Sequence, residues 1–150
     1  MRRLNLSAWL GGLAVALSLT TACGSTTTAV VPTTPVVSVT ETFSGTVGLN
    51  GAVNYNFATS SAGTVTATIA TLTGGPGFIG FSLGTWNGVA CFVGASAVSV
   101  DRAVQGTVLQ GTTTGAGALC VHMFDPTDTA GDGHGLLTTP ASFTVTVLHQ

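Results

Sequence analysis

The chain has 150 residues and few charges: three Lys or Arg side chains stand against five Asp or Glu, which gives a net charge of −2 at pH 7. Two of the cations are Arg2 and Arg3 and the third is Arg102, so the chain contains no lysine. Because a nucleic-acid backbone or an anionic lipid surface is bound through clusters of Lys and Arg, the composition excludes both as electrostatic partners.

The N-terminal residues follow the order of an export signal. Arg2 and Arg3 precede a mainly apolar segment, residues 4–19, and small Ala22 comes directly before Cys23. This order resembles a bacterial lipoprotein signal, although Thr20 occupies a position where such signals most often carry Leu. The resemblance implies that residues 1–22 form a signal peptide that is removed, and that Cys23 receives a diacylglycerol group and then an N-acyl chain such as palmitate.

The alternative for this segment is an ordinary secretory signal in which Cys23 has no special role. Residues 4–19 are broken by glycines and are shorter than the roughly 20 apolar residues of a membrane helix. We therefore expect a protein that is anchored by two or three acyl chains and does not span the membrane. Residues 23–38 comprise Cys23 and a Thr/Pro-rich segment, residues 24–38, with two prolines and no charge. We expect this segment to form a semi-rigid tether that reaches some 45 Å at roughly 3.1 Å per residue, with a disordered tail as the alternative.

From Val39 onward the apolar residues recur with a period of two, which indicates β-strands. The alternation is clear in residues 43–47, 53–57, 65–69, 79–83 and 143–147, and further strand-like runs cover residues 89–94, 103–110 and 117–124. Turn sequences such as Asn50-Gly51 and Asn87-Gly88 separate these runs. Residues 39–150 are thus expected to form an all-β domain, one antiparallel β-sandwich of seven to nine strands.

Two cysteines, Cys91 and Cys120, remain once Cys23 is assigned to the lipid. An even pair in an exported chain predicts a disulfide. Free thiols or metal ligands are the alternatives. The alternation places Leu119 and Val121 on the inward face, so the bridge is expected on an outer face or at a sheet edge.

Several of these segments resemble bacterial pre-peptidase C-terminal-like domains. The opening strands that carry the resemblance are residues 41–47 (ETFSGTV), 53–57 (VNYNF) and 63–69 (GTVTATI), and the closing ones are 119–125 (LCVHMFD) and 143–147 (FTVTV). The resemblance implies a jelly-roll-like sandwich that is non-catalytic and that binds polysaccharide, protein or calcium.

Three aspartates, Asp125, Asp128 and Asp132, lie close together in a glycine-rich loop. Carboxylates and loop carbonyls are the oxygens that calcium prefers, so calcium is a candidate cofactor, with a solvated turn as the other interpretation. His122, His134 and His149 show no paired spacing for a transition metal and are expected at the surface.

Residues 80–84 (GFSLG) match the G-x-S-x-G pattern of α/β-hydrolases, and Asp125 and His134 follow in the order of a catalytic triad. That pattern needs a strand, a sharp turn and a helix, whereas a turn and another strand are expected after Ser82. We therefore expect no enzyme. Trp86 is the candidate sugar-stacking residue, although packing in the core or over the Cys91 bridge is the alternative.

The sequence thus predicts an exported, lipid-anchored protein of the cell envelope, at the outer membrane if the source is Gram-negative. The expected function is non-catalytic binding or adhesion to a glycan or an envelope protein. The alternative is a structural or assembly lipoprotein that pairs with a partner through a sheet edge.

Overall fold

The computed structural model describes residues 35–94, 97–127 and 135–150. Within these residues the chain forms nine strands and no helix, so none occurs that is long and apolar enough to cross a membrane. The strands are β1 (Val39–Val47), β2 (Ala52–Thr59), β3 (Gly63–Gly74), β4 (Ile79–Trp86), β5 (Cys91–Phe92), β6 (Val98–Ala103), β7 (Val108–Thr113), β8 (Gly117–Phe124) and β9 (Ala141–His149).

All strand pairs are antiparallel, and their pairing is nested. β1 pairs with β9, β2 with β8, β3 with β7 and β4 with β6, so the chain resembles one long hairpin whose tip carries β5. Further pairs, β3 with β9 and β4 with β8, roll this hairpin into two sheets. Sheet A has the order β1-β9-β3-β7, and sheet B has the order β2-β8-β4-β5 with β6 also on β4. This is a jelly-roll sandwich, as the sequence predicted.

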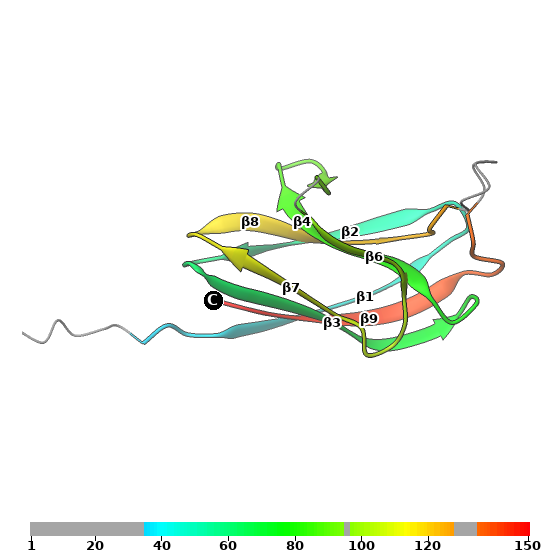
Figure 1. Ribbon diagram of the computed structural model, residues 1–150, viewed down its shortest axis with the longest axis horizontal. Helices are drawn as coiled ribbons and strands as arrows, with labels where there is room; N and C mark the ends of the chain where they lie inside the picture. Colours follow the sequence, from blue (N-terminus) through cyan, green and yellow to red (C-terminus); the bar gives the residue numbers. More distant parts are fainter. Residues whose placement is uncertain (1–34, 95–96, 128–134) are drawn as a thin grey trace, which may run out of the picture. The chain divides into compact units, whose positions relative to one another are not determined.

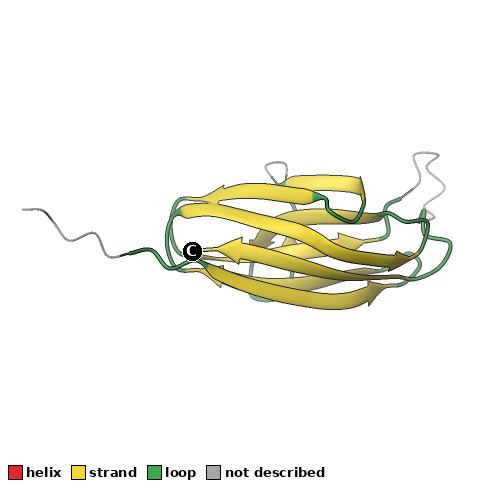
Figure 2. Cartoon of the chain, turned by 90° about the horizontal axis from the view of Figure 1, so that it is seen from below, coloured by secondary structure: helices red, strands yellow, loops and turns green. Residues whose placement is uncertain are grey.

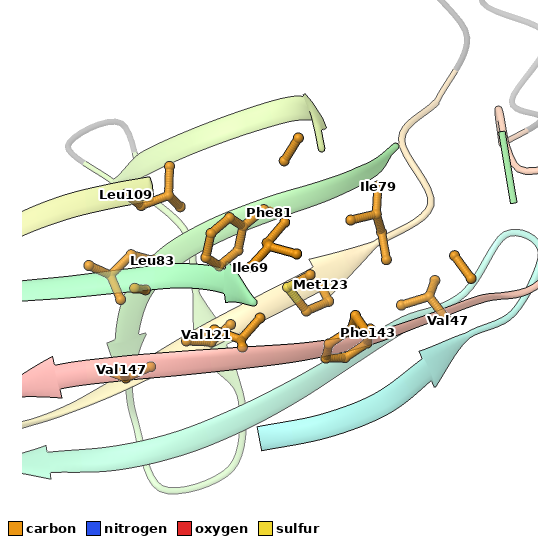
Figure 3. Close-up of a cluster of buried hydrophobic side chains, with 14 of the residues drawn as sticks. Val47, Ile69, Ile79, Phe81, Leu83, Leu109, Val121, Met123, Phe143 and Val147 are labelled. Carbon is orange, nitrogen blue, oxygen red and sulfur yellow. The ribbon is translucent and has the colours of Figure 1, made fainter. Parts of the chain in front are cut away.

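The two sheets form two layers around one apolar core (Figures 1 and 2). Alternate side chains of each strand point between the layers, as the period of two requires. Figure 3 shows the centre of the core, where Phe81, Ile69, Met123 and Val147 are completely buried. The opposite faces of β1, β3 and β9 carry mainly Thr and Ser, which keeps an almost uncharged surface polar.

Two of the predicted runs are wrong in their bounds. Residues 103–110 are not one strand, because a turn at Val104–Thr107 separates β6 from β7. Gly106 takes a positive φ of 86° in this turn, and its amide donates to the carbonyl of Ile69. Of residues 89–94 only Cys91 and Phe92 are in a strand.

The chain from Thr34 to Gln150 forms one compact unit. Every residue of the hydrophobic core, from Val47 to Val147, belongs to it, and so does the disulfide. Residues 34–150 therefore have their own core and can be studied without the preceding residues.

Candidate functional site: a groove between the two sheets

A groove of about 720 Å³ opens between the sheets along the free edge of β7. β7 forms one lip, and Phe92, Gly94, Ala97 and Val98 line the other. The groove is lined by apolar side chains (Val65, Leu83, Phe92, Val98 and Leu119), by uncharged polar ones (Thr64, Thr85, Gln110, Thr112 and Thr113), and by Gly84, Gly94, Ala97 and Gly111. None of the described lining residues carries a charge.

The groove continues toward the β7–β8 turn. A second hollow of about 330 Å³ shares Thr85, Thr112, Thr113 and Leu119 with the first and extends along residues 114–118. The two hollows thus adjoin each other along β7 and the β7–β8 turn.

Gly111 lines the groove from β7. It lies at an inward position of β7, two residues after buried Leu109, where a side chain would otherwise fill the space. A Cβ atom built on Gly111 meets only Leu83 Cδ2, at 3.1 Å. A larger side chain here would therefore extend into the groove and occupy it.

The disulfide between Cys91 and Cys120 holds the lip that carries Phe92. The two Cα atoms are 5.7 Å apart, and 29 positions separate the cysteines in sequence. Cys120 faces away from the core on β8, so the predictions that the disulfide forms and that it lies on an outer face at the edge of sheet B are confirmed.

Gly84 lets this bridge cross β4. It pairs with Cys120, and a Cβ atom on it would lie 2.5 Å from the Phe92 carbonyl oxygen and 3.3 Å from Cys91 Sγ. The Phe92 backbone thus lies directly on β4. Its ring is 65% exposed and lines the groove. Because the disulfide at Cys91 holds the backbone of Phe92 in place, the ring offers a well-positioned surface for stacking.

Trp86, the predicted sugar-stacking residue, is the last residue of β4 and pairs with Cys91. It is half-buried and is not among the residues that line the groove. Sequence reasoning missed Phe92, although its position next to a bridged cysteine was a signal that could have found it.

Asp125 is buried and is engaged with the backbone. Its Oδ2 accepts a hydrogen bond from the Asn50 amide at 2.8 Å, and its Oδ1 accepts one from the Leu137 amide at 2.9 Å. The amide of Gly135 donates to Asn50 Oδ1 at 2.7 Å, and a Cβ atom on Gly135 would collide with the Asp125 carboxylate. Asp125 therefore joins the β1–β2 turn to the segment that leads into β9.

The other two predicted calcium ligands, Asp128 and Asp132, lie outside the described residues. Within residues 35–94, 97–127 and 135–150 no cluster of three His, Cys, Asp or Glu side chains could hold a metal ion. The calcium site stays a prediction, and the geometry of Asp125 is explained without it.

Ser82 lies in the middle of β4, between β6 and β8. It faces away from the core but is buried, and its hydroxyl is 2.6 Å from that of Ser99. The chain around it has no strand–turn–helix elbow, so its hydroxyl is not raised above a sheet as in a hydrolase.

The described histidines do not form a site together. His122 lies on the outer face of sheet B, where its Nδ1 is 2.6 Å from Asn54 Oδ1 and its ring stacks on Phe124. Burial lowers the pKa of the His122 imidazole below its ordinary value. The expectation of a surface histidine is wrong for His149, which is buried on the inner face of β9, with its Nε2 at 2.9 Å from Glu41 Oε1. His134 lies outside the described residues.

No protein-family model matches the chain, and no curated protein is similar to it in sequence. The resemblances to bacterial lipoproteins and to pre-peptidase C-terminal-like domains stay predictions. Cys23 and residues 1–34, on which the first depends, lie outside the described part of the chain.

Proposed function

We propose that this protein is a lipid-anchored binding module of the bacterial cell envelope, and that the groove between its sheets binds a neutral glycan. The observation that carries the proposal is the lining of the groove: an exposed aromatic ring, apolar residues and uncharged hydroxyl and amide groups. Sugars present apolar faces that stack on aromatic rings and hydroxyls that pair with Thr and Gln side chains. The uncharged lining offers no partner for a phosphate or carboxylate.

The proposed function is binding without catalysis. Ser82 is buried in a central strand, and Asp125 is committed to two backbone amides. Neither is placed to act on a ligand in the groove. The resemblance to pre-peptidase C-terminal-like domains, which include polysaccharide-binding modules, supports the same function. Outer-membrane sorting is part of the proposal if the source is Gram-negative.

A screen on an array of neutral polysaccharides tests the groove, with a soluble chain of residues 24–150 as the probe. We expect specific binding, and we expect Phe92→Ala to weaken it by up to about tenfold, because loss of an aromatic contact costs about 0.5–1.5 kcal/mol. Val108→Ala is the matched control, since Val108 is half-exposed on β7 and does not line the groove. A blank array, or equal binding by Phe92→Ala and wild type, would contradict the assignment of the groove.

The anchor makes a separate prediction. In cell fractionation the wild-type protein is expected in the membrane fraction with an acylated N-terminus. Cys23→Ser removes the thiol that accepts diacylglycerol, so the variant is expected to lose the lipid label entirely. Labelling with a radioactive or alkyne palmitate is the readout, and incorporation of label into Cys23→Ser would disprove lipidation at this residue.

A second candidate function rests on the free edge of β7. β7 is the last strand of sheet A and runs beside the groove, so an extended peptide could pair with it and place alternate side chains between the sheets. This is the structural or assembly role in which a partner adds a strand. Competition between a neutral oligosaccharide and a captured envelope protein would separate the two functions.

A further inference from the structure

We infer that the tip of the rolled hairpin, residues 86–93, is a second membrane contact that inserts apolar side chains into the surface of a lipid bilayer. The inference rests on the proposed lipid anchor, because that anchor and its tether would keep the domain within about 45 Å of a bilayer. The tip is defined by Trp86 at the end of β4 and by the turn that leads through Val89 into β5. Figure 1 shows this segment rising away from the two sheets above β4.

The tip exposes apolar side chains that the fold could have buried. Val89 is 86% exposed and Val93 is also exposed, while the ring of Phe92 between them lines the groove and is left to the glycan. Trp86 is half-buried at the base. Tryptophan suits the interface between water and lipid, because it has an apolar body and a polar N–H.

The tip is rigid. Asn87 Oδ1 accepts hydrogen bonds from the amides of Val89 at 3.0 Å and Ala90 at 2.8 Å, and the Asn87 amide donates to the Ala90 carbonyl. The disulfide then fixes Cys91 to β8. A pre-ordered tip loses little conformational entropy when it inserts, which favours partition of only a few side chains.

Charge argues for a lipid occupant. The chain has no charged residue between Glu41 and Asp101, so insertion of the tip desolvates no ion. A narrow protruding turn offers little flat surface for a protein partner, whereas a fluid bilayer adapts to it. Acids outnumber Arg102 five to one after residue 23, so attraction to anionic lipid is not the source of binding. Binding should be apolar and insensitive to salt.

The start of β1 lies at the same end of the domain as the tip. β4 ends at Trp86 beside the start of β8, which pairs with the end of β2. The Ser60 amide, directly after β2, donates to the carbonyl of Gln150, and β9 ends opposite Val39, the first residue of β1. Residues 86–93 and the start of β1 are thus at one end of the sandwich. Tethering raises the effective concentration of lipid at the tip, so weak partition suffices.

The test uses residues 24–150, which lack Cys23, and vesicles of neutral phosphatidylcholine. Of the two tryptophans, Trp9 is absent from this part of the chain and only Trp86 remains. We expect its fluorescence to shift to the blue on vesicle addition and to be quenched by brominated acyl chains, at low and high salt alike. Val89→Ser with Val93→Ser is expected to lower the partition coefficient by about tenfold or more, because apolar burial drives it.

Leu49→Ser is the matched control, since Leu49 is 52% exposed in the β1–β2 turn at the opposite end. It should leave vesicle binding unchanged. Absence of a fluorescence shift, or equal partition of wild type and the double variant, would overturn the inference. Because the protein in this assay carries no lipid, such a result is separate from failure of Cys23 acylation.

Discussion

Removal of the disulfide, by Cys91→Ala with Cys120→Ala, is expected to lower the free energy of unfolding by about 3–4 kcal/mol. The bridge closes a loop of 29 positions, and a loop of that length restricts the unfolded chain by this amount in the chain-entropy estimate. For a domain of this size the melting temperature should fall by roughly 12–16 °C. Thermal unfolding followed by circular dichroism is the measurement.

The same variant should weaken glycan binding, because the bridge holds the backbone of Phe92 against Gly84. Reduction of the wild-type protein provides an independent control and should reproduce both effects without a substitution. Equal melting temperatures for oxidised and reduced wild type would show that the bridge does not stabilise the fold.

Asp125→Ala is expected to destabilise the domain by about 2–4 kcal/mol. The carboxylate is 7% exposed, and its loss leaves the Asn50 and Leu137 amides without their acceptors inside the protein. The buried Leu137 amide left unpaired costs about 1–3 kcal/mol, and the amide of exposed Asn50 adds less because water can replace its partner. Urea unfolding of the variant, with the midpoint and slope measured separately, checks the value.

Asp125→Asn is the matched control for this prediction. Its amide oxygen can accept one of the two backbone hydrogen bonds, so we expect roughly half the loss. Both measurements are repeated with a calcium chelator. If chelation alone destabilises the wild type as much as Asp125→Ala does, calcium binding, and not the two hydrogen bonds to backbone amides, explains how Asp125 stabilises the domain.

The period-two alternation was sufficient to predict the fold class, because each strand has one face in a shared core. Val65, Ala67 and Ile69 alternate with Thr in the sequence, and all three are buried in β3. The turn at residues 104–107 was missed because apolar Val104 continues the pattern of the strands beside it.

The groove was not predictable from local pattern. It forms where β7 and β4, strands distant in sequence, meet at a position that lacks a side chain. Gly111 at an inward position was the available signal, but inward and outward faces of β7 are clear only once its pairing with β3 is known. Phe92 was missed because its exposure depends on how the disulfide carries β5 over Gly84, which the sequence alone does not show.

The role of Asp125 also depends on contacts between residues that are distant in sequence. Asp125 lies in a loop rich in Asp and Gly, which fits either a turn or a calcium site. Its partners, the amides of Asn50 and Leu137, are far apart in the sequence. The nested strand pairing brings them together at Asp125. The sequence shows the residue types but not this convergence.

The measurement that tests the groove most directly is calorimetric titration of neutral hexasaccharides (cello-, laminari-, malto- and chito-oligosaccharides) into wild type and Gly111→Val. Valine suits an edge strand and Gly111 does not have a positive φ, but its Cβ would lie 3.1 Å from Leu83 Cδ2, so Leu83 must shift slightly; circular dichroism and the melting temperature show whether the variant is folded. We predict that wild type binds at least one of these sugars and that Gly111→Val loses the binding, because its side chain occupies the groove. Equal affinity in a folded Gly111→Val variant would contradict the account.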